Sequence, residues 1–239
     1  MLNKADYEII GDDLQAVKIN LSKEKAVLAD PGNLVYITNN IKMDVTLGEF
    51  NYFEKVLSAF KRAIVGENFF LTRFSSDSDI GEIVFSSPVP GKIIPVEIPP
   101  EGLICEKQSY LCSDSNIKIE IAFARRIGAG LFGREGFILQ KLTGEGTAFI
   151  QASGTIIKKT LQPEESIRLD PGCVVAFEPS VDYDIKYVGD IRTALFGGVG
   201  IFFVTLIGPG DVYIQTLPLN KLSQKILSKS KFPKAKSNG

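Results

Sequence analysis

The stretches Gly136–Gln151 (GFILQKLTGEGTAFIQ) and Gly200–Gln215 (GIFFVTLIGPGDVYIQ) decide the fold, because they are two copies of one pattern. At an offset of 64 residues (200 minus 136) they match at three glycines, at the leucine before the second glycine and at the final Ile-Gln pair. Glycine marks backbone that turns sharply, so matched glycines indicate matched turns. The alignment extends without a gap over Cys105–Ala152 and Leu169–Thr216. Self-similarity of this length predicts repeated structure.

An earlier copy begins at Asp30-Pro31-Gly32, which matches Asp170-Pro171-Gly172. In all three copies the following segment ends in alternating apolar and polar residues, as in Ile41–Val45 (IKMDV), Ile117–Ile121 (IKIEI) and Val181–Ile185 (VDYDI). Such alternation is typical of a strand with one buried face. We therefore predict one all-β domain over residues 1–219, made of three tandem copies of an antiparallel β unit at about 25–98, 104–160 and 166–219.

Two segments depart from this pattern. The first copy carries an insertion at 51–65 whose apolar residues, among them Phe53, Val56 and Leu57, have the spacing of a short amphipathic helix. The chain after Asn220 is polar and basic. We expect residues 220–239 to form a flexible tail.

The composition excludes several classes of enzyme. The 239 residues have a formal net charge of -1 and contain no histidine, so Ser-His, Cys-His and His-metal mechanisms are absent. The three cysteines form no CxxC pair, and we expect them to be small core residues. An odd cysteine count without a signal peptide favours a cytoplasmic location. We expect no enzymatic activity, no catalytic residues, no cofactor and no metal site.

Several motifs are better explained by structure than by chemistry. The glycine string Gly128-x-Gly130-x-x-Gly133 leads into a strand instead of opening a helix, which argues against a dinucleotide loop. The uncharged stretch 193–210 corresponds to a charged stretch in the second copy, which argues against a membrane helix. Asp182 and Asp184 alternate along a strand and should lie on its solvated face.

One apolar feature recurs between the halves of the copies and supplies the candidate contact residues. These are Phe60 and Ile64 in the first copy, Leu131 and Phe132 in the second, and Leu195 and Phe196 in the third. Such residues either fold back over an open sheet end or gather as a contact surface for a protein or a membrane. Both interpretations are open at this point.

Four stretches resemble a known family: Asp30–Tyr36 (DPGNLVY), Gly66–Leu71 (GENFFL), Pro88–Ile93 (PVPGKI) and Leu195–Gly200 (LFGGVG). They are similar to the family named after the mitochondrial biogenesis protein "altered inheritance of mitochondria 24", from about Tyr7 to Leu219. The resemblance implies a sandwich or double-stranded β-helix-like fold similar to the tryptophan RNA-binding attenuation protein, whose β units assemble into rings. It also implies a role near a membrane for mitochondrial members, and it brings no catalytic residues.

We therefore expect a non-enzymatic β scaffold that self-associates, with a homotrimer of nine units as the hypothesis, because open sheet edges favour closure by other subunits. Its apolar loops would contact a protein partner or the periphery of a membrane. The alternative is a small-molecule or nucleic-acid binding module that uses clefts between repeats; the net charge of -1 argues against nucleic acid. An enzyme with a bound cofactor or paired carboxylates is the third hypothesis.

Overall fold

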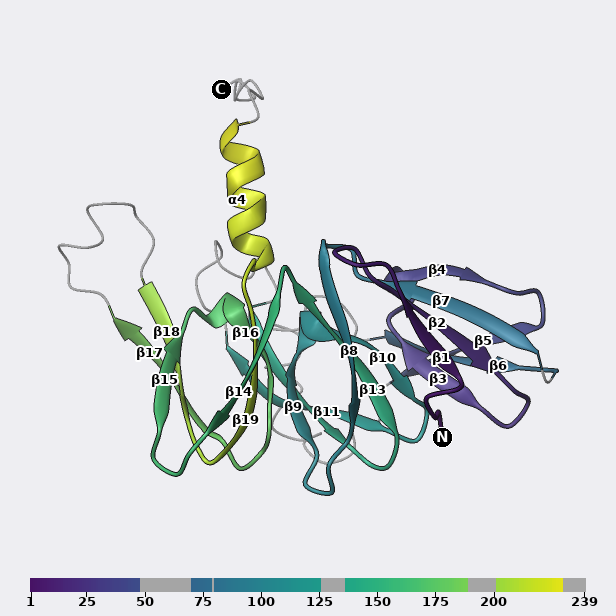
Figure 1. The fold of residues 1–239 in the computed structure, drawn as a ribbon, viewed down its shortest axis with the longest axis horizontal. Coiled ribbons are helices and arrows are strands. Elements are labelled where there is room, and N and C mark those ends of the chain that lie inside the picture. Colours follow the sequence, from purple (N-terminus) through teal and green to yellow (C-terminus); the bar gives the residue numbers. More distant parts are fainter. Residues whose placement is uncertain (48–69, 79, 126–135, 189–200, 230–239) are drawn as a thin grey trace, which may run out of the picture.

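The computed structural model describes residues 1–47, 70–78, 80–125, 136–188 and 201–229, and these residues fold almost entirely into antiparallel β-sheets (Figure 1). The predicted all-β class is confirmed. The helix predicted within 51–65 lies outside the described residues.

The same order of elements occurs in three successive stretches, here called units one, two and three. Unit one contains β3 (Ala26–Ala29), η1 (Pro31–Asn33), β4 (Leu34–Ile37), β5 (Ile41–Leu47), β6 (Phe70–Ser76), β7 (Gly81–Ser86) and β8 (Gly91–Glu97). Unit two contains β9 (Leu103–Glu106), η2 (Lys107–Ser109), β10 (Tyr110–Asp114), β11 (Lys118–Arg125), β12 (Phe137–Thr143), β13 (Thr147–Ser153) and β14 (Ile156–Leu161).

Unit three differs from the others in its last element. It contains β15 (Ser166–Leu169), η3 (Pro171–Cys173), β16 (Val174–Phe177), β17 (Asp182–Val188), β18 (Ile201–Ile207) and β19 (Gly210–Gln215), and then helix α4 (Leu219–Lys229) where the other units have a strand. Two strands, β1 (Tyr7–Ile10) and β2 (Ala16–Leu21), precede unit one.

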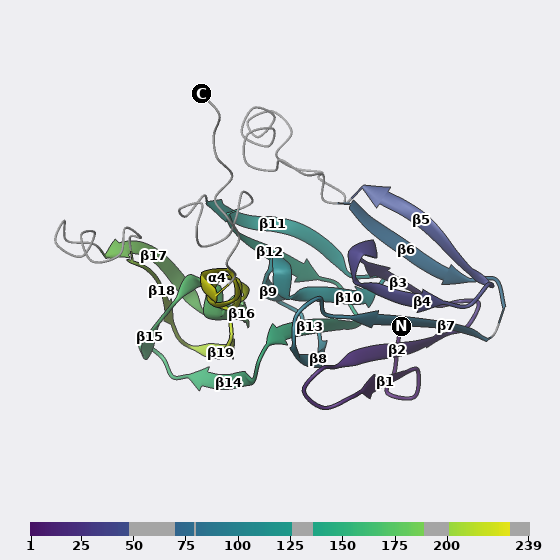
Figure 2. The ribbon, with the colours of Figure 1, turned by 90° about the horizontal axis from the view of Figure 1, so that it is seen from above.

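The strands form four sheets, numbered here along the chain (Figure 2). The strand orders are β1-β2-β7-β4 in sheet 1, β5-β6-β3-β10-β13-β8 in sheet 2, β11-β12-β9-β16-β19-β14 in sheet 3 and β15-β18-β17 in sheet 4. In sheets 2 and 3 the first strand of one unit pairs with the second strand of the next, as β3 with β10 and β9 with β16. Each middle sheet is therefore shared by two units.

An acidic side chain caps the 3-10 turn of every unit. Its carboxylate accepts a hydrogen bond from the amide two residues later, at 2.8 Å for Asp30, 2.8 Å for Glu106 and 2.9 Å for Asp170. The bond satisfies a turn amide that has no partner within the turn. The matched Asp-Pro-Gly sequences of units one and three thus mark a turn that unit two builds from other residues.

A second side-chain bond recurs at the start of β7, β13 and β19. There a backbone amide donates to Thr38 Oγ1 at 3.0 Å, to Asp114 Oδ2 at 2.8 Å and to Glu178 Oε2 at 3.0 Å. Asp114 is buried and accepts a further bond from the Leu2 amide at 2.8 Å, which ties the first residues of the chain to unit two. The acceptor thus lies at the same position in every unit, but it is a hydroxyl in unit one and a carboxylate in units two and three.

Three hydrophobic cores fill the spaces between consecutive sheets. Phe149 lies in the first core, Cys105 in the second and Phe177 in the third. Sheets 2 and 3 contribute to a core on each face, and all seven residues of β13 are buried. Strand β17 in sheet 4 has one buried face, and its residues 182–186 alternate as the sequence predicts.

The start of the predicted C-terminal tail is instead the helix α4, which extends away from the sheets in Figure 1. Leu219, Leu222 and Ile226 recur at helical spacing within a polar sequence, and Pro218, which cannot donate a hydrogen bond, lies just before the first turn. Lys221 anchors the helix by an ion pair of 3.0 Å with Asp170 of unit three. We expected a flexible tail because the segment is polar and basic, and its few apolar residues gave a weak helical pattern.

Candidate functional site

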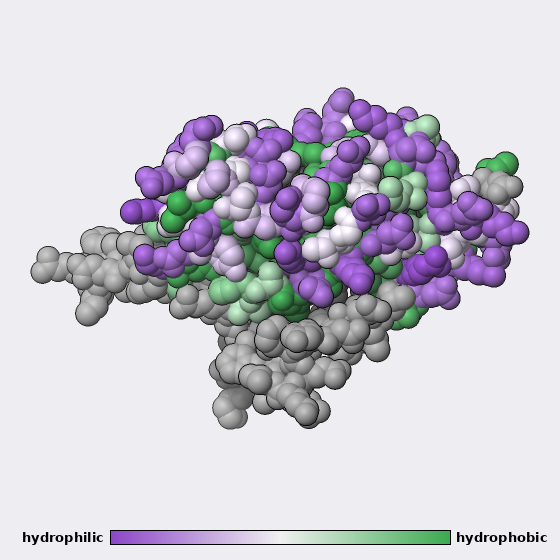
Figure 3. Space-filling model, turned by 90° about the horizontal axis from the view of Figure 1, so that it is seen from below, coloured by the Kyte–Doolittle hydropathy of each residue, from purple (hydrophilic) through white to green (hydrophobic). Residues whose placement is uncertain are grey.

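The six candidate contact residues, Phe60, Ile64, Leu131, Phe132, Leu195 and Phe196, lie outside the described residues. Whether they form an exposed surface or fold back over a sheet end therefore stays a prediction. On the face shown in Figure 3, hydrophilic side chains cover most of the described surface. Hydrophobic side chains show mainly along the lower side of the coloured surface in this view. The described residues offer two other sites, at the ends of the array and between its units.

The two ends of the array are complementary. Strands β3 and β9, the first strands of units one and two, each pair with the second strand of the following unit. Strand β15 is the first strand of unit three and forms one edge of sheet 4. Strand β4 is the second strand of unit one and forms one edge of sheet 1. Each end thus presents the strand that the other end would pair with.

Burial differs sharply between these edge strands and their interior counterparts. Val35 of β4 is 54% exposed, whereas the residues at the same position of units two and three, Leu111 and Val175, are 0% exposed. Tyr36 is 46% exposed, and its counterparts in β10 and β16 are fully buried. An apolar side chain that is exposed only at the end of an array indicates a surface that another element covers.

Strand β2 supplies sheet 1 with the strand that a preceding unit would contribute. It pairs with β7 as β8 pairs with β13 and as β14 pairs with β19. With sheet 4 placed beside β4, the order would be β17-β18-β15-β4-β7-β2, which repeats the order of sheets 2 and 3. The position after unit three, where α4 replaces a strand, would then be occupied by β2 of another copy.

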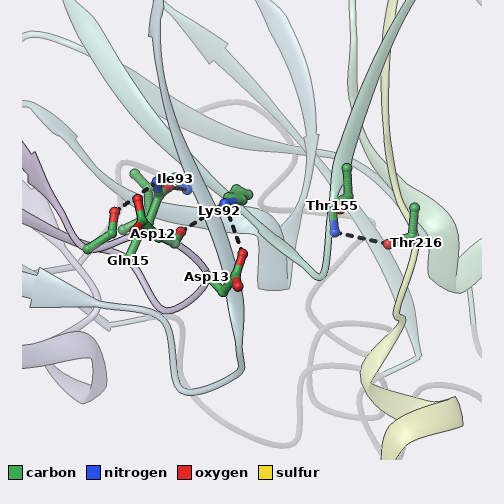
Figure 4. Close-up of polar contacts among 8 residues, drawn as sticks. Asp12, Asp13, Gln15, Lys92, Ile93, Thr155 and Thr216 are labelled. Carbon is green, nitrogen blue, oxygen red and sulfur yellow. Dashed lines mark hydrogen bonds and ion pairs between the residues drawn. The ribbon is translucent and has the colours of Figure 1, made fainter.

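Polar contacts join the N-terminal segment to unit one and unit two to unit three (Figure 4). Lys92 Nζ donates to the Asp12 carbonyl at 2.9 Å, and the Ile93 amide donates to Gln15 Oε1 at 2.7 Å. Between units two and three, the Thr155 amide donates to Thr216 Oγ1 at 2.9 Å. Backbone amides at these junctions are thus satisfied by side chains of the neighbouring segment.

A cavity of about 240 Å³ lies where residues of all three units meet. Polar residues form part of its wall: Asp30, Asn33, Lys107, Gln108, Ser109, Gln151, Ser153 and Gln215. Pro88, Val89, Tyr110 and Leu219 contribute to the remainder. This location fits the alternative expectation of a cleft between repeats. The Ile-Gln pair repeated at 150–151 and 214–215 was the sequence signal for it, although its role could not be read from one strand alone.

The cysteines offer no reactive thiolate at this cavity. Cys105 and Cys112 are buried as predicted, and burial raises the pKa of both thiols well above the ordinary value. Cys173 is partly exposed, and burial raises its pKa as well. Within the described ranges, no three Cys, Asp or Glu side chains are grouped closely enough to hold a metal ion. Across these ranges, no helix is long and apolar enough to cross a membrane.

Comparisons with known proteins give the family. The family model described as "Mitochondrial biogenesis AIM24" matches residues 7–217, which agrees with the extent of the resemblance seen in the sequence. An uncharacterized protein of Streptococcus pyogenes serotype M6 is 30% identical over 210 residues, covering 87% of this chain and 83% of that protein. The crystal structure of a Streptococcus pyogenes protein superposes with a TM-score of 0.72 at 25% identity, covering 93% of this chain and 98% of that chain. The chain belongs to the mitochondrial biogenesis AIM24 family.

Proposed function

We propose that this protein is a non-enzymatic scaffold that assembles head to tail with further copies of itself, by pairing β15 of one copy with β4 of the next. The observation that carries the proposal is the strand order, in which β15 and β4 are the counterparts of strands that pair inside the chain. A contact of this type joins different surfaces of the two copies and produces a closed ring when the rotation between copies permits it.

The interior pairs predict the register of this contact. Cys105 lies opposite Ala176, and Ile104 lies opposite Phe177. The corresponding end residues are Leu169 opposite Tyr36, and Arg168 opposite Ile37. Strands β15 and β4 have four residues each, as β3 and β9 have, so the contact would match the interior ladders in length.

Assembly would also cover the outer face of sheet 1. In the interior, Leu111 and Val175 point from the second strand of their units into a core between sheets. Val35 occupies the same place in β4, and in an assembly it would extend the third core of the preceding copy. Burial of this apolar surface would stabilise the assembly by about 25 cal/mol per Å². The pairing would also satisfy the edge amides of both strands.

The number of copies is proposed as three, which gives a ring of nine units. Such a ring would place the three loop regions that contain Phe132, Phe196 and Phe60 of every copy in equivalent positions. It would thereby present a repeated apolar contact to a protein partner or to a membrane surface. The absence of histidine supports a binding role over a hydrolytic one.

The assembly is tested by disulfide cross-linking in a Cys173→Ser background. We expect Tyr36→Cys combined with Leu169→Cys to yield linked chains under mild oxidation, since facing strand positions come close enough for a disulfide. The matched control is Tyr36→Cys with Lys186→Cys, which lies on β17 at the opposite edge of sheet 4. Light scattering should give three times the chain mass. A monomer at micromolar concentration that does not cross-link would refute the proposal.

A further inference from the structure

A buried acceptor without a partner lies in the wall of the cavity between the units. Gln151 is 6% exposed, and its Oε1 has no hydrogen-bond partner among the described residues. Its Nε2 donates to the Gln108 carbonyl at 2.7 Å, which fixes the end of the amide that carries the oxygen. A buried polar atom without a partner is uncommon in proteins and calls for a ligand, a water molecule or a structural reason.

The corresponding glutamine of unit three is fully satisfied. Gln215 Nε2 donates to the Gly172 carbonyl at 2.7 Å, as Gln151 Nε2 does to the matching turn. Gln215 Oε1, in addition, accepts from the Ser153 amide at 2.7 Å. Ser153 lies three residues before Ile156, which is the residue paired with Gln215. The donor therefore comes from the preceding unit, at the last residue of β13.

A proline explains why Gln151 lacks the same bond. Gln151 pairs with Ile93, and the residue three positions before Ile93 is Pro90. The strand register gives this correspondence, since Pro90 and Ser153 each lie three residues before the partner of the glutamine. Both carbonyls accept from an amide after that glutamine, Pro90 from Gly154 at 2.9 Å and Ser153 from Leu217 at 3.1 Å, although the two donors differ by one position. Proline has no N–H, so the donor that satisfies Gln215 is missing at Gln151.

The cavity beside this acceptor has the chemistry of a site for a small cation. Asp30 places a carboxylate in the wall, and Pro88, Val89 and Leu219 offer carbon surface. A volume of about 240 Å³ is smaller than the sites that hold drug-sized ligands, so the ligand has few atoms. Lys107 adds a positive charge to the wall, and its repulsion disfavours ligands that carry more than one positive charge.

We propose that the cavity binds a small aliphatic monoamine. Its ammonium group donates an N–H to Gln151 Oε1 and is balanced by the Asp30 carboxylate, while its alkyl chain packs against the apolar part of the wall. Every residue of the site belongs to one chain, so the inference does not depend on head-to-tail assembly.

Three probes separate the features of such a ligand in calorimetric titrations of the full chain. Butylammonium has both the donor and the charge, tetramethylammonium has the charge without an N–H, and n-butanol has a neutral donor. We expect butylammonium to bind with a dissociation constant of about a millimolar, as suits a ligand of so few atoms. The other two should bind at least about tenfold more weakly, since each lacks one interaction. Equal binding of all three, or no binding, would overturn the proposal.

Two variants test the site in opposite ways. Gln151→Met removes the acceptor and should weaken butylammonium binding at least about tenfold. Pro90→Ala restores an amide N–H that can satisfy Gln151 Oε1, so it should also abolish binding while raising the melting temperature. The matched control is Gln140→Met, because Gln140 is also buried with unpartnered amide atoms but does not line this cavity.

The outcomes are distinguishable even where one variant folds poorly. Pro90→Ala leaves Gln151 in place, so unchanged binding in a folded Pro90→Ala chain counts against the site. Equal losses in Gln140→Met and Gln151→Met would show a general effect on the fold and would also overturn the proposal. A crystal soaked with butylammonium that shows only an ordered water on Gln151 Oε1 would do the same.

Discussion

Strand β9 inside the chain and strand β15 at its end occupy the same place in their units but have different surroundings. All four residues of β9 are buried between β12 and β16, whereas β15 has a partner on one side and alternates between exposed and partly buried residues. The second strands differ in the same way, since β10 is fully buried and β4 is not. The end strands therefore show what an interior strand looks like when its neighbouring unit is missing.

The proposed head-to-tail assembly would explain this difference. Repeat proteins that function as monomers need end units with a polar outer face. Strand β4 instead exposes Val35 and Tyr36 at the edge of sheet 1, as the described residues define it. The following predictions run from the largest expected effect to the smallest, and the first tests whether the end strands pair with another copy.

The largest effect is expected from introducing a charge at the matched positions Leu111 and Val35. Leu111→Asp should prevent folding, because a buried carboxylate costs several kcal/mol and the whole stability of a domain is about 5–15 kcal/mol. Val35→Asp should leave each chain folded but reduce the mass measured by light scattering to that of one chain. Circular dichroism supplies the control for folding. A Val35→Asp protein that keeps the wild-type mass would remove Val35 from the proposed contact.

A smaller but still large effect is expected from Phe149→Ala. Phe149 is 0% exposed in a sheet covered on both faces, and its ring meets that of Tyr7 edge to face at a centroid distance of 4.9 Å. Removing it should lower the free energy of unfolding by about 3–5 kcal/mol. Val45→Ala, at a residue that is 70% exposed, should change it by less than about 0.5 kcal/mol. Urea unfolding measures both, and similar losses would contradict the packing described here.

The recurring acceptors at the starts of β7 and β13 should differ in strength. Asp114→Ala leaves two amides, those of Leu2 and Thr147, without their acceptor, and we expect a loss of about 2–4 kcal/mol. Thr38→Ala removes a neutral acceptor in a part-buried site and should cost about 1 kcal/mol. Hydrogen exchange of the Thr147 amide reports the change directly. Unaltered protection in Asp114→Ala would show that this bond contributes little.

The smallest effect is expected from the ion pair that links β14 to β19. The hydrogen bond from Lys158 lowers the pKa of Asp211 below its ordinary value of 3.8. A carboxyl group with a lowered folded-state pKa stabilises the protein above the unfolded pKa, and this contribution is lost as the pH falls through the folded value. Asp211→Asn should therefore lower the melting temperature slightly near neutral pH.

The size of this difference is limited by exposure. Lys158 is 54% exposed, so screening by solvent should hold the effect to a few tenths of a kcal/mol. The melting curves of wild type and Asp211→Asn should approach each other as the pH falls through the folded-state pKa of Asp211, because the ion pair is then lost in the wild type as well. A gap that does not narrow on acidification would assign the loss to the hydrogen bond that Thr160 donates to Asp211 instead.

Much of the fold could be predicted because period-two alternation and turn glycines are local features of the chain. Ile117–Ile121 and Val181–Ile185 lie within or beside strands as their alternation indicates. The sharing of sheets between units could not be predicted, because strand pairing depends on contacts far apart in the sequence. The helix α4 was missed for a different reason: its apolar residues are few, and Leu219 and Ile226 are exposed, so composition gave a stronger signal than spacing.

The site was harder to anticipate than the fold. A proline at position 90 reads locally as a turn residue, and nothing in its own segment shows that an amide is needed there. Its effect appears only when the register of β8 on β13 is compared with that of β14 on β19. The contact residues proposed from the sequence, such as Phe132, were chosen because apolar residues recur at that place in each copy. They lie outside the described residues and stay predictions.

The sharing of each middle sheet by two units has a consequence for how this chain can be cut or rearranged. Neither middle sheet belongs to a single unit, so a protease that cleaves between units two and three, near 162–165, would leave two fragments that stay paired through β9 with β16 and through β14 with β19. Such a nicked protein should stay associated until it is denatured. By the same reasoning, unit two expressed alone would lose the pairings of β9, β10, β13 and β14 with strands of its neighbours, so a single unit should not fold by itself.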